Sequence, residues 1–333
     1  MTTLVLPRIA FAGLGWIGRH RMNAVAESGV AEIAYVCDPV AELKDVAAPS
    51  VACYDDLLAS DADAIVIASP SALHAEQAIA ALDAGKAVFC QKPLGRNADE
   101  TRRVIDAARR NDLLLGVDLS YRHTAALNAV RDLVQRGELG DIYAVDLTFH
   151  NAYGPDKPWF RDPKLSGGGC VIDLGIHLVD LGLWTLGFPR VAGVTARTFA
   201  HGSPQFDRDT NVEDFATARI DLDGGAAMTL ACSWNLPAGR DCVLAATFYG
   251  TRGAAALRNV DGSFYDFVAE RYDGTRTTGI AEPPDAWGGR AIVAWAERLA
   301  ASRRFDPDIA HLTAVAETLD AIYESGRRSG RPA

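Results

Sequence analysis

The sequence predicts an α/β protein of two domains, a parallel sheet built from βαβ units followed by an α/β region whose strands are mostly antiparallel. In the first third, short apolar runs alternate with helical patterns, which is typical of βαβ units. From about residue 191 to 267, β-rich runs follow one another with turns between them, which favours antiparallel pairing. The length of 333 residues fits about two domains of roughly 150 residues each. We place the domains at 1–121 and 122–333, because the pattern changes there.

The first domain is expected to alternate buried strands with amphipathic helices. Asn97 is the expected N-cap of one helix, and Glu100, three residues later, completes a capping box. Expected strands cover 8–12, 32–37, 64–68, 87–90 and 113–117, and expected helices run to about residue 28, over 72–84 and from residue 97 onward.

The second domain begins with a helix and a strand and ends with two helices. The last helix carries one apolar face, formed by Ile309, Leu312, Val315, Leu319 and Ile322. The segment 151–169 is rich in glycine and proline and is expected to be a loop. The other expected elements are helices over 124–136, 170–186, 286–302 and 308–325 and a strand over 142–149.

Composition excludes several classes of protein. Hydrophobic residues make up 49% and charged residues 23% of the chain, which rules out a disordered chain. The net charge of -10, from 33 basic and 43 acidic residues, argues against nucleic acid and against an anionic membrane surface as partners. We find no stretch of about 18 apolar residues and expect no signal peptide at the apolar start, which lacks a basic region. The six cysteines form no CxxC pair, so we expect reduced thiols and a cytoplasmic protein.

A glycine-rich loop follows the first expected strand and opens a helix. It reads Gly13-Leu14-Gly15-Trp16-Ile17-Gly18. In such a loop the first glycine permits a tight turn, the second lets the backbone approach a pyrophosphate, and the third allows helix and strand to pack closely. The helix N-terminus then offers N–H groups to the phosphates. The alternative is a structural turn without a ligand, but the strand before it and the helix after it favour dinucleotide binding.

Asp38 ends the second expected strand, twenty residues after Gly18. A carboxylate at this place accepts hydrogen bonds from the adenosine ribose and repels a 2′-phosphate, so NAD is favoured over NADP. Arg19 and Arg21 lie close enough in sequence to leave NADP open as the less favoured cofactor.

Three further segments are expected at the carboxyl ends of strands, where ligands bind in open α/β sheets. They are 69–74, 84–86 and 90–94. Lys92 precedes Pro93, which disfavours helical backbone, so its side chain is expected to project from a strand end. The alternative is a solvated surface lysine.

The segment after Gly167-Gly168-Gly169 places three polar residues on one face of an apolar helix. Asp173, His177 and Asp180 are spaced i, i+4 and i+7. A histidine satisfied by a helix neighbour is the plainer alternative. We expect no metal site, because no third ligand has a firm spacing.

Taken together, these motifs resemble the Gfo/Idh/MocA family, the glucose–fructose oxidoreductase and inositol dehydrogenase group, over nearly the whole chain. The family's Glu-Lys-Pro element matches Gln91-Lys92-Pro93, and its Gly-Gly-Gly…Asp…His element matches 167–180. The resemblance implies a Rossmann domain and a second α/β domain with an open, mostly antiparallel sheet. It also implies a homodimer or homotetramer formed through that sheet.

The resemblance also assigns residues. It implies Lys92, Asp173 and His177 as the active-site trio, with Tyr121 and Arg122 near nicotinamide and substrate. Trp159 and Arg161 resemble a loop that borders the substrate. The expected cofactor-binding residues are Gly13, Gly15, Trp16, Ile17, Gly18, Asp38, Ser69, Pro70, His74, Gln91 and Lys92. Two positions depart from the family pattern: Gln91 stands where glutamate is usual and Ser71 where asparagine is common.

The expected activity is NAD-dependent hydride transfer from an alcohol carbon of a sugar or polyol. His177 is the candidate general base, because the reference pKa of imidazole, about 6.5, lies close to working pH. Asp173 would hold the imidazole or bind a substrate hydroxyl, and Lys92 would stabilise developing alkoxide charge. Two alternatives stay open at this point, an NAD-dependent glycoside hydrolase and a non-catalytic NAD-binding regulatory protein.

Overall fold

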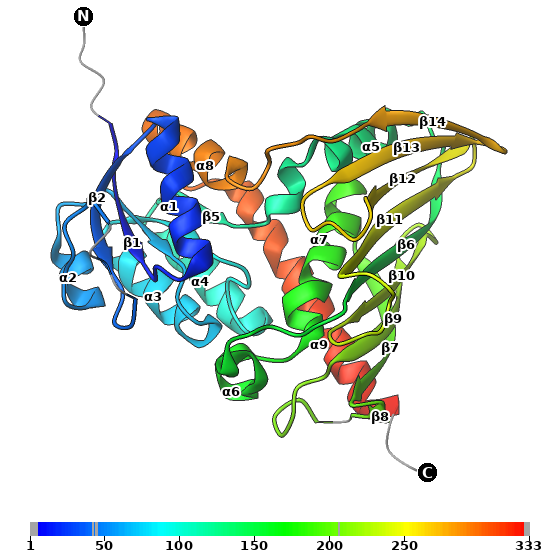
Figure 1. Ribbon diagram of the computed structural model, residues 1–333, viewed down its shortest axis with the longest axis horizontal. Helices are drawn as coiled ribbons and strands as arrows, with labels where there is room; N and C mark the ends of the chain where they lie inside the picture. Colours follow the sequence, from blue (N-terminus) through cyan, green and yellow to red (C-terminus); the bar gives the residue numbers. More distant parts are fainter. Residues whose placement is uncertain (1–5, 42, 44–45, 206, 330–333) are drawn as a thin grey trace, which may run out of the picture. The chain divides into compact units, whose positions relative to one another are not determined.

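The computed structural model describes residues 6–41, 43, 46–205 and 207–329 (Figure 1). The apolar start at residues 1–5, for which no signal peptide is expected, lies outside these residues. The chain divides into two compact units. Unit 1 comprises Met1–Ser120 and Gly288–Ala310, and unit 2 comprises Tyr121–Trp287 and His311–Ala333. The segment Gly288–Ala310 was predicted to belong to the second domain, and this part of the prediction is wrong.

Unit 1 contains a parallel sheet of five strands among the described residues, in the order β2-β1-β3-β4-β5. Connections leave β1 in both directions in this order, so the β1/β3 boundary is the place where such sheets bind ligands. The strands are β1 (Arg8–Ala12), β2 (Glu32–Cys37), β3 (Ala64–Ile67), β4 (Ala87–Cys90) and β5 (Leu115–Val117), and the helices are α1 (Trp16–Ser28), α2 (Tyr54–Ala59), α3 (Ser71–Asp83), α4 (Ala98–Arg110) and α8 (Arg290–Ala301).

Helix α8 returns to unit 1 because its apolar side packs on the parallel sheet. The indole of Trp295 lies 5.4 Å from the ring of Phe89 in β4, measured between centroids. A side chain at Gly116 of β5 would meet this indole, since an added Cβ would lie 2.4 Å from its Cδ1 atom. Both partners lie about 200 residues before α8, so the sequence pattern near α8 gave no sign of this packing.

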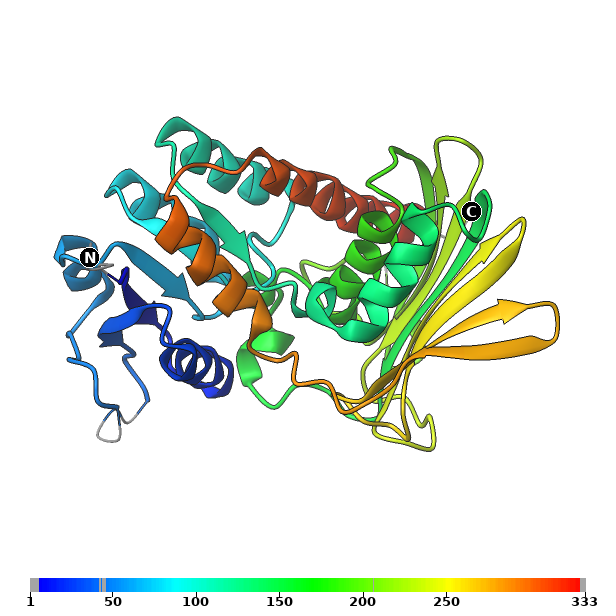
Figure 2. The same ribbon diagram turned by 90° about the horizontal axis from the view of Figure 1, so that it is seen from above.

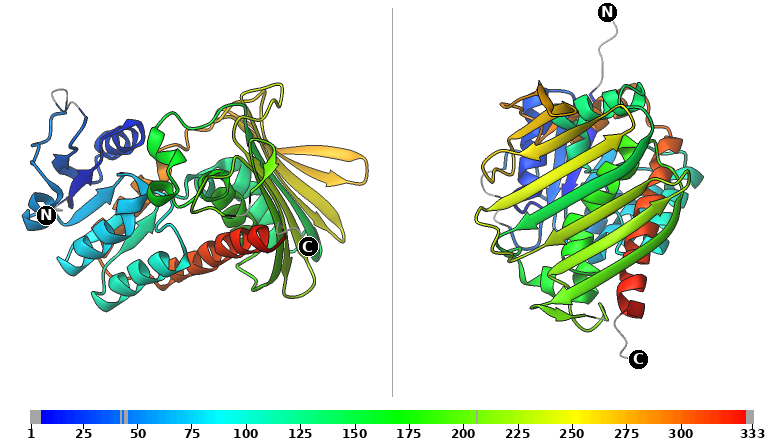
Figure 3. Two further views of the ribbon diagram at one scale, coloured as in Figure 1. Left: turned by 90° about the horizontal axis from the view of Figure 1, so that it is seen from below. Right: turned by 90° about the vertical axis from the view of Figure 1, so that its right-hand side faces the viewer.

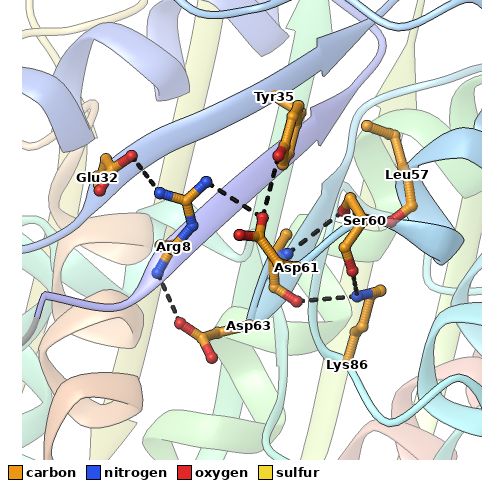
Figure 4. Close-up of polar contacts among 9 residues, drawn as sticks. Arg8, Glu32, Tyr35, Leu57, Ser60, Asp61, Asp63 and Lys86 are labelled. Atoms are coloured by element: carbon orange, nitrogen blue, oxygen red, sulfur yellow. Dashed lines mark hydrogen bonds and ion pairs between the residues drawn. The ribbon is translucent and has the colours of Figure 1, made fainter.

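The amino edge of the parallel sheet is held by a polar network (Figure 4). The ammonium of Lys86 donates to the carbonyl oxygens of Ser60 (2.7 Å) and Ala62 (2.9 Å). Arg8 donates to Glu32 and Asp61. The segment 84–86 was predicted to follow a strand, but it precedes β4 and lies at the opposite edge from the expected ligand. Lys86 is therefore a structural residue.

Unit 2 contains, among the described residues, a mixed sheet of nine strands in the order β14-β13-β12-β11-β6-β10-β9-β7-β8. Within this described sheet only β6 and β10 pair in parallel, so the predicted mostly antiparallel sheet is confirmed. The strands are β6 (Ile142–Asn151), β7 (Val191–Ala200), β8 (Ser203–Pro204), β9 (Phe215–Leu222), β10 (Ala227–Ser233), β11 (Cys242–Gly250), β12 (Gly253–Asn259), β13 (Phe267–Asp273) and β14 (Arg276–Ala281).

Three helices cover one face of the mixed sheet (Figure 2). They are α5 (Ala125–Gln135), α7 (Ile176–Thr185) and α9 (Leu312–Ser329). On β6, Val145, Leu147 and Phe149 alternate with less buried residues and join the core beneath these helices. The shorter pieces are α6 (Pro163–Ser166) and the 3₁₀ turns η1 (Ser120–His123), η2 (Pro158–Arg161) and η4 (Pro307–His311).

The predicted helix over 170–186 is two segments in the structure. Val171–Gly175 forms a π-helical turn, labelled η3, and α7 follows it directly. π-Helical turns inside α-helices occur frequently at functional sites.

Trp184 and the neighbouring residues continue a long apolar run, and the span Pro163–Thr185 has the length and composition of a membrane helix. No membrane span is expected from the sequence. In the most apolar 18 residues of Pro163–Thr185, 78% are buried inside the protein, as in the core helix of a soluble protein.

Candidate active site

The carboxyl edge of the parallel sheet aligns five chain segments. Strand register pairs Ala12 with Cys37 and Ile67, Ile67 with Cys90, and Cys90 with Val117. The residues that follow these positions therefore lie along one edge, and they include Gly13, Asp38, Ser69, Gln91, Lys92 and Asp118. The cofactor-binding residues predicted from the sequence lie in these segments or in the first turns of α1 and α3, which follow β1 and β3.

The glycine loop has the local geometry that its sequence pattern requires. Gly13 has φ 91°, and a Cβ there would lie 2.5 Å from the Ala68 carbonyl oxygen. A Cβ at Gly18 would lie 2.1 Å from the Gly13 carbonyl oxygen. At Gly15, the N-cap of α1, an added Cβ would meet nothing within 4 Å. The first and third glycines are thus required by packing, whereas Gly15 faces open space, which fits the approach of a pyrophosphate.

Asp38 is anchored against this loop by backbone hydrogen bonds. Its Oδ2 accepts from the N–H of Leu14 (2.6 Å), and its Oδ1 accepts from the N–H groups of Val40 and Ala41 (both 2.8 Å). Burial raises the pKa of the Asp38 carboxyl, but these hydrogen bonds outweigh burial and the net pKa lies below the usual range. Asp38 is therefore a fixed anion directly beside the glycine loop.

His74 connects the loops that follow β3 and β4. One ring nitrogen lies 2.7 Å from the carbonyl oxygen of Ser69 and the other 2.7 Å from that of Pro93. The side chain is only 2% exposed, and burial lowers its pKa. Both ring nitrogens are engaged by backbone, so His74 supports the loops on which Ser69, Pro70 and Lys92 stand. Lys92 itself is half-buried.

A network of buried hydrogen bonds lies directly after β4 and β5. It accounts for glutamine at position 91, because an amide can donate to the Asp118 carboxylate. Asp118, 2% exposed, accepts hydrogen bonds from the Gln91 amide and the Ser120 hydroxyl. Arg21 donates from Nε to the same carboxylate at 2.5 Å. Arg21 is therefore bound inside unit 1. Sequence reasoning missed Asp118, although a carboxylate directly after a predicted strand was a visible signal.

In unit 2, Asp173 and His177 are more exposed to solvent than the residues around them. Across the described stretch 168–183 every residue is buried except these two. The Asp173 carboxylate accepts a hydrogen bond from the indole N–H of Trp234 at 3.1 Å. The His177 ring meets the Tyr121 ring edge-to-face at 4.8 Å between centroids. The exposed part of this segment is thus polar and held by aromatic neighbours. Trp234, directly after β10, was not predicted.

Asp180 and Arg122 form a buried ion pair in unit 2. The Arg122 guanidinium donates twice to Asp180, from Nε at 2.8 Å and from Nη2. The ring centroids of Trp184 and Phe188 each lie 5.6 Å from the guanidinium carbon of Arg122. The Asp180 carboxylate is thus nearly fully buried against Arg122, unlike the half-buried Asp173 and His177. The ion pair holds Arg122 against α7, and its predicted place near the substrate stays a prediction.

The loop before the glycines carries a chain of aromatic rings. Trp159 stacks on Phe160 at 3.8 Å between centroids, and Phe160 meets Trp234 edge-to-face at 6.4 Å. Through Trp234 this chain reaches Asp173. Arg161 is exposed, and its Nη2 lies 3.0 Å from the place a Cβ at Gly154 would take. Aromatic rings therefore connect Trp159, in the loop expected to border the substrate, with Asp173.

In the described part of the chain, no group of three or more histidine, cysteine, aspartate or glutamate side chains is placed to hold a metal ion.

Comparison with known proteins gives the family. Residues 7–119 match the model of the oxidoreductase family with an NAD-binding Rossmann fold, and residues 127–256 match that of the GFO/IDH/MocA C-terminal domain. The rhizopine catabolism protein MocA of Rhizobium meliloti is 30% identical over 75% of this chain and 78% of its own length. The chain belongs to the Gfo/Idh/MocA family. It is an NAD(P)-dependent oxidoreductase.

Other relatives differ in named substrate and cofactor. D-Glucoside 3-dehydrogenase of Escherichia coli K12 is 31% identical, but the match spans only 60% of each chain. D-Xylose 1-dehydrogenase (NADP(+)) 2 of Haloferax volcanii is 31% identical over 82% of this chain and 81% of its own. Among solved structures, GenD2 from gentamicin A biosynthesis in complex with NAD has a TM-score of 0.80 at 26% identity, covering 99% of this chain and 97% of its own.

Proposed function

We propose that this oxidoreductase is an NAD-dependent dehydrogenase that oxidises an alcohol carbon of a sugar or polyol, with Lys92, Asp173 and His177 as its active-site trio. The observation that carries the proposal is that Asp173 and His177 are half-buried in a stretch, 168–183, whose other residues are buried. Side chains that keep accessible surface can meet a ligand, whereas Asp180 of the same helix is already paired inside the fold.

The proposed roles follow from the chemistry of each group. NAD, when bound, supplies the acceptor for the hydride that leaves the alcohol carbon. His177 takes the hydroxyl proton on a ring nitrogen as the C–H bond breaks, so that the alcohol becomes a carbonyl. The Lys92 ammonium donates a hydrogen bond to the reacting oxygen and stabilises its negative charge. Asp173, fixed by Trp234, accepts from a substrate hydroxyl or orients His177.

The choice of NAD over NADP is part of this proposal. The Asp38 carboxylate, held by three backbone N–H groups, would repel a 2′-phosphate placed at the end of β2. Arg21, one of two arginines that could have neutralised that phosphate, is committed to Asp118. Arg19 donates to the Leu14 carbonyl oxygen at 3.1 Å, and its charge helps to lower the pKa of Asp38. The fixed Asp38 carboxylate and the pairing of Arg21 with Asp118 are therefore the contacts that support NAD.

The test is NAD(P)⁺ reduction, followed by absorbance, across aldoses, ketoses, inositols and sugar acids. We expect sustained NADH formation with at least one of them. His177→Ala should lower turnover by on the order of 10²-fold or more while NADH still binds, and Lys92→Ala should be at least as damaging. Near-normal turnover in either variant would remove that residue from the trio. Release of an aglycone without net NADH would instead identify a glycoside hydrolase.

We propose further that copies of this chain associate through the face of the mixed sheet opposite α5, α7 and α9. The right-hand view of Figure 3 looks onto this face. Its central positions are small and half-buried, among them Thr148, Ala231 and Ala245, which lets two flat sheets approach closely. We expect a dimer or tetramer by light scattering and a monomer for Ala231→Arg. An unchanged mass in that variant would contradict the proposal. Cytoplasmic location stays a prediction.

A further inference from the structure

Glu213 is a fully buried acidic residue that the proposed reaction does not use. It precedes β9, is 0% exposed, and burial raises the pKa of its carboxyl. Its carboxylate accepts from the N–H of Gly169, 3.0 Å from each oxygen, and from the N–H of Val171 at 2.8 Å. Its backbone carbonyl oxygen accepts from the N–H of Cys170 at 3.0 Å. Three successive N–H groups are thus held by one residue.

These N–H groups open the helical segment that carries Asp173. The first N–H groups of a helix have no partner inside the helix, and when buried they need one from elsewhere. Here Glu213, 42–44 residues away in the chain, supplies it. The N–H of Asp173 in turn donates to the Gly169 carbonyl oxygen at 3.1 Å. The carboxylate therefore fixes the turn from which the Asp173 side chain projects.

Glycine is required at two positions for this contact. A Cβ at Gly169 would lie 1.8 Å from the Glu213 carbonyl oxygen. A Cβ at Gly168, where φ is 155°, would lie 2.1 Å from the hydroxyl oxygen of Tyr323. That hydroxyl donates to Glu213 at 2.9 Å. The glycine run thus serves the approach of Glu213 and Tyr323 to the helix start.

Asp214, the residue after Glu213, holds Trp234, whose indole donates a hydrogen bond to the Asp173 carboxylate. The carbonyl oxygen of Asp214 accepts from the backbone N–H of Trp234 at 2.7 Å. The Trp234 indole then donates to the Asp173 carboxylate at 3.1 Å. Residues 213–214 therefore hold both partners of this hydrogen bond, Asp173 through the helix start and Trp234 through its backbone.

We propose that Glu213 is a positioning residue that sets the place of the Asp173 carboxylate for catalysis. For its kinetic consequence this rests on the proposed function, in which Asp173 acts on the substrate. Misplacement of a catalytic group by about 1 Å can cost on the order of 10²-fold in rate. Loss of the carboxylate should therefore lower kcat, whereas NADH binding by unit 1 should stay the same.

The experiment compares Glu213→Gln with wild type. In glutamine an NH₂ group replaces one acceptor oxygen and opposes a backbone N–H donor, because both oxygens of Glu213 face the N–H of Gly169. The position of Asp173 is read from the indole ¹⁵N–¹H resonance of Trp234 in ¹⁵N-tryptophan protein, one of six tryptophans, assigned with Trp234→Phe. We expect this resonance to move and kcat to fall about ten- to a hundredfold, with the Kd of NADH within about twofold of wild type.

Two further variants keep the test decisive. Glu213→Asp retains the charge but is one methylene shorter, so we expect an intermediate shift and an intermediate kcat. Lys86→Met is the control for lost stability, because it removes two buried hydrogen bonds at the amino edge of the parallel sheet, and it should leave both readouts unchanged.

An unmoved Trp234 resonance and wild-type kcat in Glu213→Gln would overturn the proposal. An equal effect of Lys86→Met at a matched loss of Tm would overturn it as well. If wild type forms no NADH with any sugar or polyol, the proposed function fails, and the Trp234 resonance still decides the role of Glu213.

Discussion

Replacing Gln91 by glutamate should destabilise the protein in a pH-dependent way. Gln91 is 8% exposed and its amide donates to the Asp118 carboxylate, which is 2% exposed. In Gln91→Glu two carboxyl groups would share this contact. The Arg21 guanidinium, which donates to Asp118, balances only one of the two carboxylates, so in this buried site the other must keep its proton.

The magnitude follows from the free energy of protonation. A protonated glutamate side chain at position 91 can still donate to Asp118, so the cost is that of keeping the proton above its ordinary pKa of about 4.3. This cost grows by about 1.4 kcal/mol per pH unit and reaches about 3–4 kcal/mol at pH 7. The sign is that of a carboxyl whose folded-state pKa is raised. The native state binds the extra proton, so stability relative to wild type falls as pH rises from about 4.3.

The assay is urea unfolding of wild type and Gln91→Glu at pH 5 and pH 7.5. We expect a difference of about 1 kcal/mol at pH 5 and a loss of about 4–5 kcal/mol at pH 7.5. Adding Asp118→Asn to Gln91→Glu moves the single carboxylate to position 91 and should restore most of the loss. A pH-independent difference, or a double variant less stable than Gln91→Glu, would refute the reasoning.

Two further predictions concern charged residues of each unit. Asp38→Asn should weaken NADH binding at least about tenfold. Because the folded-state pKa of Asp38 is lowered, the ionised carboxyl stabilises the folded protein above about pH 4, and this stabilisation is lost on acidification. The free energies of unfolding of wild type and variant should therefore converge at low pH. Arg122→Met leaves Asp180 buried without its ion pair and should cost about 3–5 kcal/mol in urea unfolding, whereas Arg122→Met with Asp180→Leu should recover most of it. A single variant as stable as wild type would contradict the buried pair.

Local chemistry made part of the fold predictable. The glycine loop could be recognised because a tight turn, an open backbone and close packing each need glycine at a fixed position. Alternating strands and helices predicted the parallel sheet, because βαβ units place successive strands parallel. The N-cap Asn97 is confirmed, since its side chain accepts from the N–H of Glu100 at 2.8 Å. The Glu100 carboxylate, however, accepts from the N–H of Arg96 at 2.7 Å, one residue before the predicted partner.

Other features depend on contacts between residues far apart in the chain. Helix α8 belongs to unit 1 because Trp295 packs on Phe89. Arg122 braces Asp180 across 58 residues, so sequence spacing on the helix could not separate Asp180 from Asp173. The glutamine at position 91 became intelligible only once Asp118 was found beside it.

By itself the sequence determined the order of the elements, the dinucleotide loop and the residue types available for catalysis, because each of these is encoded in turns, caps and periodicity over a few neighbours. The tertiary structure decided which polar groups are used up inside the fold and which stay exposed. Asp118, Asp180 and Glu213 are all buried carboxylates with partners from distant elements, whereas Asp173 and His177 keep exposed surface. Burial and pairing are long-range properties, since they depend on how strands and helices pack, and no short stretch of sequence records them.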